Sequence, residues 1–212
     1  NLASQSSRTI GIILPASRQE AYQNSFYLET IRGISQFCNQ KQYINTVITG
    51  ENEEEILQGI RTMARSGQAE GFIVLYSRTH DPVAEYLYVE GLPYVLIGKA
   101  YQNANQTIYV DNDNVLAGRE AASYLIRLGH RRIAYLSADN SLLFAEDRKT
   151  GYLSALLEHG LPIQPEYCIE MNCDSEKRDE ILKELLISSQ RPTAVLVSDD
   201  ILAMFVGNGC GS

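Results

Sequence analysis

Polar side chains at the start of one predicted helix have the types and spacing to bind a hydroxylated small molecule. Gln23, Asn24 and Tyr27 follow a short apolar run and lead into a segment with apolar residues at helical spacing. Backbone N–H groups and a side-chain amide at such a helix start can hold hydroxyl groups. An alternative role for Asn24, compatible with the first, is to cap the helix.

Two further apolar runs also end in polar residues. Tyr76 and Arg78 come at the end of one run, and Gly98 and Lys99 follow the next run along the chain. The Lys99 ammonium group can donate hydrogen bonds to hydroxyl groups or to an anion. The alternative for Lys99 is an ordinary solvated lysine on the surface.

Arg148 lies in the first turn of a predicted helix, where a positive charge is unfavourable. Glu146 and Asp147 suit the positive end of the helix dipole. An arginine there has an electrostatic cost unless a negative or hydroxyl-rich group engages its planar set of donors. We therefore predict that Arg148 binds a ligand, and a local ion pair with a neighbouring acid is the alternative.

Ser198, Asp199 and Asp200 directly follow an apolar run and precede another helical segment. One of the two acids must cap that helix, which leaves the other to face a ligand. Asp199 is the candidate ligand-binding residue, and capping alone is its alternative role.

The sequence lacks the motifs of nucleotide-binding and catalytic proteins. No GxGxxG follows the first apolar run, and no GxxxxGK[ST] occurs. His80, His130 and His159 share no motif with a nucleophile. The prediction is a protein that is not an enzyme and uses no cofactor.

The four cysteines do not indicate a metal centre. They form no CxxC pair or other matched spacing. Cys168 and Cys173 with His159 are a conceivable ligand set, but three scattered ligands are what chance supplies. We predict no metal site.

Eight short apolar runs alternate with helix-length segments, which predicts a mostly parallel, doubly wound sheet fold with helices on both faces. The expected strands are residues 9–14, 44–49, 71–75, 94–97, 107–110, 133–136, 167–170 and 193–197. Ligands of such folds sit beyond the carboxyl ends of the strands, where the polar candidates lie. The polar stretch 100–106 suggests two lobes, 9–104 and 105–206, with a cleft between them.

Composition narrows the class of protein. Hydrophobic residues make up 44% of the chain, and 18 basic residues against 26 acidic residues give a net charge of −8, which disfavours DNA binding by this chain. No apolar run approaches the roughly 20 residues of a membrane helix. Residues 1–8 show no signal-peptide pattern, so we expect a cytoplasmic location.

Four ordered motifs resemble one known family. They are residues 110–118 (VDNDNVLAG), 124–134 (YLIRLGHRRIA), 147–152 (DRKTGY) with Ala155-Leu156, and 197–203 (VSDDILA). Together they resemble the effector-binding core of LacI/GalR-type bacterial transcription regulators. Residues 24–27 with Gly33-Ile34 are similar to that family's first-lobe helix. The segment 76–99 is similar to the subgroup that regulates maltose and maltodextrin operons.

The resemblance implies a periplasmic-binding-protein-like fold with two doubly wound lobes and a sugar effector in the cleft between them. It also implies a homodimer that binds operator DNA through an N-terminal helix-turn-helix, which is absent from this chain. Maltose or a maltodextrin is the expected effector, and phosphorylated sugars stay open because Arg78, Lys99 and Arg148 can serve an anion. The ligand-binding residues carried over are Gln23, Asn24, Tyr27, Tyr76, Gly98, Lys99, Arg148 and Asp199. His130 is expected to be structural.

The chain departs from the family pattern at its end. Residues 1–8 are similar to the end of the family's hinge, whereas 207–212 match nothing in the family, so we expect an atypical tail and a second lobe that is truncated. The alternative function is that of a transport-linked periplasmic sugar-binding protein, which shares the fold but needs an export signal.

Overall fold

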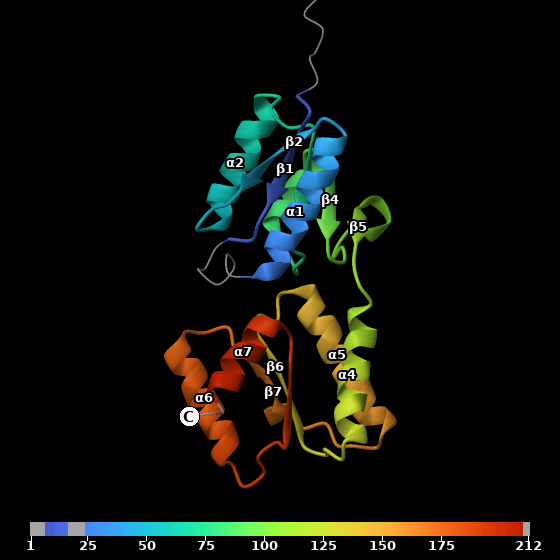
Figure 1. Cartoon of the computed structure of the whole chain (residues 1–212), viewed down its shortest axis with the longest axis vertical. Coiled ribbons are helices and arrows are strands. Elements are labelled where there is room, and N and C mark those ends of the chain that lie inside the picture. The colour runs from blue at the N-terminus through green and yellow to red at the C-terminus, as the bar shows by residue number, and fades with distance from the viewer. Residues whose placement is uncertain (1–6, 17–23, 210–212) are drawn as a thin grey trace, which may run out of the picture. The chain divides into compact units, whose positions relative to one another are not determined.

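The computed structural model describes residues 7–16 and 24–209, which form two compact units that divide between Asp111 and Asn112 (Figure 1). Each unit has a parallel sheet with helices on both faces, as the alternation of apolar runs predicted. All eight expected strands are present within a residue or two of their predicted bounds. No helix in the described ranges is long and apolar enough to cross a membrane.

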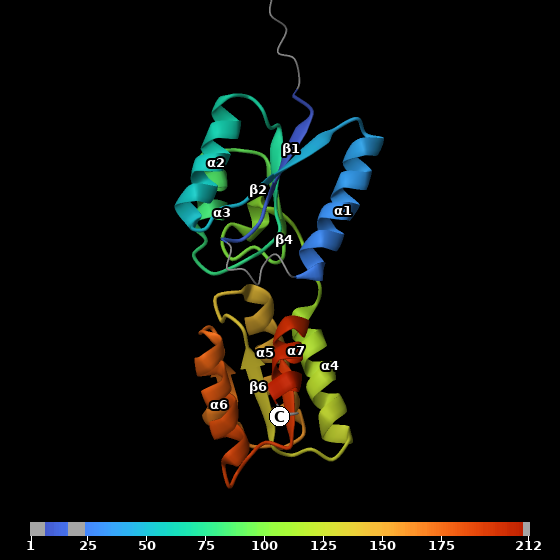
Figure 2. The ribbon, with the colours of Figure 1, turned by 60° about the vertical axis from the view of Figure 1, so that its left-hand side comes forward.

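The first unit has a five-stranded parallel sheet in the order β2-β1-β3-β4-β5. Its strands are β1 (Thr9–Ile13), β2 (Ile44–Ile48), β3 (Gly71–Val74), β4 (Tyr94–Ile97) and β5 (Ile108–Val110). Its helices are α1 (Ser25–Gln40), α2 (Glu53–Arg65) and α3 (Pro82–Val89), with a short 3-10 turn, η2 (Ala104–Gln106). Figure 2 shows α1 on one face of the sheet and α2 and α3 on the other.

Successive side chains of β1 point to opposite faces of the sheet, and helices cover both faces. Ile12 packs under α1 with Leu75, whereas its neighbour Ile13 packs under α2 and α3 with Val74. Successive strand residues point to opposite faces, so a strand covered on both sides must be apolar throughout. This is why the strands could be recognised as nearly continuous apolar runs.

The start of α2 has a side-chain cap and charges that suit the helix dipole. Asn52 caps the helix by accepting a hydrogen bond from the Glu55 backbone N–H at 3.0 Å. Acids fill the first turn and Arg65 lies in the last turn, so both ends suit the helix dipole. The acidic run at 53–55 is therefore the first turn of a helix.

The second unit has a three-stranded parallel sheet in the order β7-β6-β8. The strands are β6 (Ile133–Ser137), β7 (Cys168–Glu170) and β8 (Ala194–Val197), and the helices are α4 (Asn114–Arg127), α5 (Leu143–Glu158), α6 (Ser175–Ile187) and α7 (Asp200–Gly209), with a 3-10 turn, η3 (Pro165–Tyr167). Tyr135 of β6 packs under α4 and α5, and Leu136 packs under α6 and α7. His130 contacts Thr193 through its Nδ1 at 2.9 Å from the hydroxyl oxygen, in keeping with a structural role.

Two predicted boundaries differ from the structure. The division between the units follows Asp111 rather than residue 104, because β5 pairs in parallel with β4 and so belongs to the first sheet. The polar stretch 100–106 is a connection within the first unit. The atypical tail expected from residue 207 begins inside α7, which extends to Gly209. Residues 1–6, 210–212 and the candidate Gln23 lie outside the described residues.

Candidate ligand-binding site

Three of the candidates in the first unit lie at the carboxyl ends of β3 and β4. Tyr76 comes shortly after β3, and Gly98 and Lys99 follow β4. These two strands are paired neighbours, so the residues that follow them meet at one edge of the sheet. The Ser77 hydroxyl donates a hydrogen bond to the Lys99 carbonyl and joins the two strand ends.

Gly98 is required by the backbone at this edge. Its φ of +117° lies in the region that favours glycine, and a Cβ at this position would lie 2.7 Å from the Ser77 Cβ. Its N–H donates to the Val110 carbonyl at 2.7 Å, which continues the link from β4 to β5. Gly98 therefore shapes the edge through its backbone.

Asn24 and Tyr27 are the two candidates at the start of α1. The Asn24 Oδ1 accepts a hydrogen bond from the Phe26 N–H at 2.9 Å, so the capping role is confirmed. The Tyr27 ring packs against Leu14 and Leu75 at the carboxyl end of the sheet. Capping uses one oxygen of Asn24, and the Nδ2 amide group is a donor that capping does not use.

Tyr76 and Lys99 differ sharply in their surroundings. Tyr76 is 5% exposed, and its burial, followed by the negative charge of Asp81, raises the pKa of the phenol above its usual value. Tyr76 therefore stays a neutral phenol. Lys99 is exposed. The neighbouring cation Arg78 forms an ion pair with Glu53 of α2 at 2.9 Å.

Arg148 of α5 is held in a polar cluster of the second unit. Its Nε donates to the Asn114 Oδ1 at 3.0 Å, and its Nη1 donates to the Ser198 carbonyl that follows β8. Its guanidinium carbon lies 4.9 Å from the centre of the Phe144 ring. In the described part of the chain no carboxylate forms an ion pair with Arg148, so the alternative of a local ion pair is not what the structure shows.

A close approach of α4 and α5 fixes the backbone at Arg148. A Cβ on Gly118 of α4 would lie 2.0 Å from the Arg148 carbonyl oxygen, and a Cβ on Gly151 of α5 would lie 2.0 Å from the Val115 carbonyl oxygen. Only glycine at both positions allows the helices to pack this closely. The contact brings Arg148 next to Asn114 at the start of α4.

Asp199 caps α7 and contacts the same cluster. Its Oδ1 accepts a hydrogen bond from the Leu202 N–H at 2.8 Å, and its Oδ2 accepts one from the Ser198 hydroxyl at 2.7 Å. Ser198 is 1% exposed, and its Oγ also accepts from the Ala138 N–H at 3.1 Å, next to β6. The capping role is confirmed, and a carboxylate with about four lone-pair sites keeps the capacity to accept from a ligand.

Sequence reasoning missed the two groups that orient Arg148. Asn114 is 4% exposed although it lies in the first turn of α4, and Ser198 was considered only as a neighbour of the two acids. Both residues lie within motifs that the sequence analysis quoted. Their contacts with Arg148 depend on how the helices and strands pack, and local sequence patterns do not indicate that packing.

The arrangement supplies hydrogen-bond donors and acceptors rather than reactive groups. Each sheet has polar side chains at its carboxyl edge, which is where doubly wound folds bind ligands. Within residues 7–16 and 24–209, no three His, Cys, Asp or Glu side chains are grouped to hold a metal ion. An Arg fork, a carboxylate, a buried phenol and amides are the groups that recognise hydroxylated or anionic small molecules.

Comparison with known proteins agrees with this reading. Residues 7–208 match the family of periplasmic binding proteins and sugar binding domains of the LacI family. The chain is 32% identical over 98% of its length to the HTH-type transcriptional regulator MalR of Streptococcus pneumoniae serotype 4, of which it covers 63%. It is 28% identical over 96% of its length to the ribose operon repressor of Haemophilus influenzae, of which it covers 59%. The chain thus spans less than two thirds of these relatives.

A solved structure shows the same fold. A LacI transcriptional regulator from Bacillus cereus subsp. cytotoxis superposes with a TM-score of 0.89 at 39% identity, over 96% of this chain and 72% of that protein. The relatives are regulators and binding proteins rather than enzymes, as the sequence predicted. The chain belongs to the family of periplasmic binding proteins and sugar binding domains of LacI-type transcription regulators.

Proposed function

We propose that this chain is the sugar-sensing part of a transcriptional repressor and that Arg148 binds hydroxyl groups of the sugar. The observation that carries the proposal is the way Arg148 is held. Its Nε donates a hydrogen bond to Asn114 and its Nη1 donates one to the Ser198 carbonyl. Its Nη2 has no hydrogen-bond partner among the described residues. A guanidinium whose orientation is already fixed loses little entropy when it binds a ligand.

The other candidates are proposed ligand-binding residues of their own units. Asp199 accepts hydrogen bonds, and Tyr76, Lys99 and Asn24 contribute a phenol, an ammonium group and an amide at the carboxyl edge of the first sheet. Tyr27 and Gly98 shape that edge through packing and backbone geometry. Maltose or a maltodextrin is the proposed sugar because the MalR relative is 32% identical to this chain. Phosphorylated sugars are the alternative ligands that the cations allow.

In the whole protein, the proposed coupling runs from sugar to operator DNA. The relatives are named as HTH-type regulators and operon repressors, which supports a DNA-binding helix-turn-helix and a cytoplasmic location for the whole protein. A homodimer is part of the same proposal. The sugar shifts an equilibrium between two states of the dimer, and the shift is limited by the difference in its affinity for the two states. Because these relatives are transcription regulators, transport-linked binding is not proposed.

Isothermal titration calorimetry with maltose, maltotriose, ribose and glucose 6-phosphate tests the proposal. One sugar class should bind, and Arg148→Ala should weaken its binding by about 10-fold to 100-fold, the loss of a charge-assisted hydrogen bond. Arg119→Ala is the matched control, because Arg119 lies on α4 and pairs with Glu158 of α5 at 3.4 Å outside the Arg148 cluster. Equal affinity in both variants would disprove the role of Arg148, and no binding to a cooperatively folded chain would disprove sugar sensing by this chain.

A further inference from the structure

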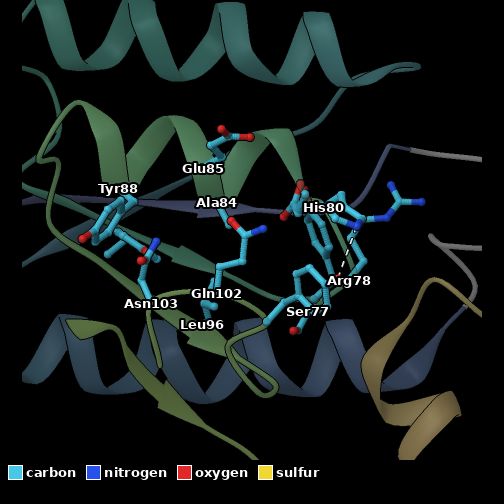
Figure 3. A pocket seen from close by; sticks show the side chains of 13 residues that line it. Ser77, Arg78, His80, Ala84, Glu85, Tyr88, Leu96, Gln102 and Asn103 are labelled. Carbon is cyan, nitrogen blue, oxygen red and sulfur yellow. Dashed lines mark hydrogen bonds between the residues drawn. The ribbon is translucent and has the colours of Figure 1, made fainter. Parts of the chain in front are cut away.

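The first unit contains a cavity of about 220 Å³ on the α3 side of the sheet, between that helix and the connection from β4 to β5 (Figure 3). Figure 3 shows Ala84, Glu85 and Tyr88 along α3, with Gln102 and Asn103 on the opposite side. The volume is below the range of about 300–1,000 Å³ that holds drug-sized ligands. The cavity therefore suits a molecule with roughly the size of a monosaccharide or smaller.

Five of the thirteen residues that line this cavity are aromatic, and hydrogen bonds hold several of them. Tyr88 donates its hydroxyl to Gln106, and the Tyr94 hydroxyl lies 3.2 Å from the Thr107 hydroxyl. These contacts tie α3 and β4 to the segment that leads into β5. With Tyr76 and Tyr101, four phenol rings border the cavity.

One end of the cavity is bordered by an aromatic pair. The His80 and Tyr101 rings meet edge to face with centroids 5.0 Å apart, and the Tyr101 hydroxyl lies 3.2 Å from the His80 Nε2. His80 and Asn103 both have positive φ values, 50° and 54°, although neither is glycine. The surrounding contacts therefore hold two unfavourable backbone conformations beside the cavity.

Asp81 lines the cavity with a carboxylate oxygen that accepts no hydrogen bond from the part of the chain that the structure describes. Asp81 is 7% exposed, and its Oδ1 caps α3 by accepting from the Val83 N–H at 3.1 Å. Its Oδ2 is buried and has no hydrogen-bond partner among the described residues. A buried carboxylate oxygen without a donor is unfavourable, and such groups in folded proteins normally have a function or an unrecorded partner.

The charges around the cavity favour a cation as that partner. Asp81 and Glu85 are two acids in the lining, and Arg78, the one Lys or Arg of the lining, pairs with Glu53 outside it. The negative charge of these two carboxylates is larger than the partial positive charge, roughly half an elementary charge, at the N-terminus of α3. The faces of tyrosine rings attract ammonium groups by their negative electrostatic potential.

We propose that this cavity binds a small organic ammonium ion, with Asp81 as its counter-ion and tyrosine rings as its walls. The site lies within the first unit and does not involve Arg148 or Asp199. The proposal therefore does not depend on the role of Arg148 in sugar binding. Tyr76 belongs to both residue sets, so the variants that test the cavity leave Tyr76 unchanged.

Choline and its uncharged carbon analogue 3,3-dimethylbutan-1-ol are matched probes, because they differ only in the charged centre. Calorimetric titration of the 212-residue chain should detect choline and not the neutral analogue. Asp81→Asn keeps an oxygen to cap α3, since asparagine is as good an N-cap as aspartate, but it removes the charge. Choline should bind this variant at least about 10-fold more weakly, as expected for a lost charge pair in a desolvated site.

Asp174→Asn is the control for removal of an N-cap charge, because Asp174 caps α6 in the second unit and accepts from the Lys177 N–H at 2.9 Å. It should leave choline binding unchanged. Equal binding of the neutral analogue, equal binding by Asp81→Asn, or no choline binding to the unmodified chain would overturn the proposal.

A second pair of variants tests the aromatic wall. Tyr101 and Tyr109 are 45% and 42% exposed, but only Tyr101 lines the cavity. Tyr101→Ala should weaken choline binding severalfold, and Tyr109→Ala should not change it. Equal effects of the two substitutions would contradict the proposed site. Maltose titrated into the same samples reports on the proposed sugar site, so failure of one proposal is distinguishable from failure of the other.

Discussion

The carbonyl oxygen of Arg148 occupies the space where Gly118 lacks a side chain, since a Cβ on Gly118 would lie 2.0 Å from that oxygen. The guanidinium of Arg148 reaches Asn114, which lies one turn earlier on the same helix as Gly118. A residue without a side chain thus sets the position of the residue that we propose as the main sugar ligand.

Gly118→Ala should lower the free energy of unfolding by at least about 1–3 kcal/mol, because the added methyl overpacks the contact between α4 and α5. It should also weaken sugar binding, because Arg148 must move. Urea denaturation and calorimetry measure the two effects. The control is Gly33→Ala in α1, where nothing lies within 4 Å of an added Cβ. Gly33→Ala should stabilise the chain by about 0.5–1 kcal/mol. If Gly118→Ala also stabilised the chain, the packing argument would be wrong.

Asn114→Ala removes the acceptor for the Nε of Arg148. The half-buried donor is then left without this partner, so the free energy of unfolding should fall by about 1–2 kcal/mol. Sugar affinity should fall as well, because the guanidinium is no longer oriented. Chemical denaturation checks the first effect and titration calorimetry the second. Unchanged sugar affinity in a folded Asn114→Ala protein would show that Asn114 does not position Arg148.

Gly98→Ala should destabilise the first unit, because alanine is strained at a φ of +117° and its methyl would lie 2.7 Å from the Ser77 Cβ. We expect a loss of about 1–3 kcal/mol in the free energy of unfolding, measured by urea denaturation. Gly91 also has a positive φ, +64°, but has open space around it. Gly91→Asn, which tolerates the left-handed region, should cost less. A smaller loss for Gly98→Ala than for Gly91→Asn would contradict this account.

Asp81→Asn should raise the free energy of unfolding at neutral pH. Burial raises the pKa of Asp81 from 3.8 to about 6, opposed by the Val83 N–H and the charge of Arg78, while the charge of Glu53 adds to the rise. The folded chain therefore binds this proton more tightly than the unfolded chain, and the ionised group is destabilising above pH about 6. A rise of about two pKa units corresponds to at most about 3 kcal/mol.

The stabilisation from Asp81→Asn should shrink as the pH falls from about 6 to about 4, because the native aspartate then becomes neutral too. Urea denaturation of both proteins at several pH values in that range measures the difference. Asp174→Asn at an exposed cap is the control for effects of other titrating groups. A pH-independent difference between the Asp81 variant and the native chain would refute the linkage.

Several features could be predicted from local sequence because they follow from local physics. Strands covered on both faces, such as β1 and β6, must be apolar. The edge strands β2 and β5 are mostly apolar as well although most of their residues are exposed, so all eight strands were recognised. Caps need a short polar side chain at the helix start, so Asn24 and Asp199 were predicted as cap candidates. Polar residues at strand ends and helix starts marked the ligand-binding candidates, and the family resemblance assigned the same residues to a sugar site.

Other features depend on contacts between distant segments. The boundary between the units was misplaced because the polar stretch 100–106 resembles a linker, whereas the pairing of β5 with β4 assigns residues 108–110 to the first sheet. The partners of Arg148 and the unsatisfied oxygen of Asp81 were also missed. The sequence by itself determined the strands, the order of the elements and the caps at Asn24 and Asp199, because short-range sterics and burial dictate them. It placed the start of the Arg148 helix at Glu146, whereas α5 begins at Leu143, so Arg148 does not lie in its first turn. Only the tertiary structure determined which strand ends, glycines and polar groups meet, because those contacts join residues far apart in the chain.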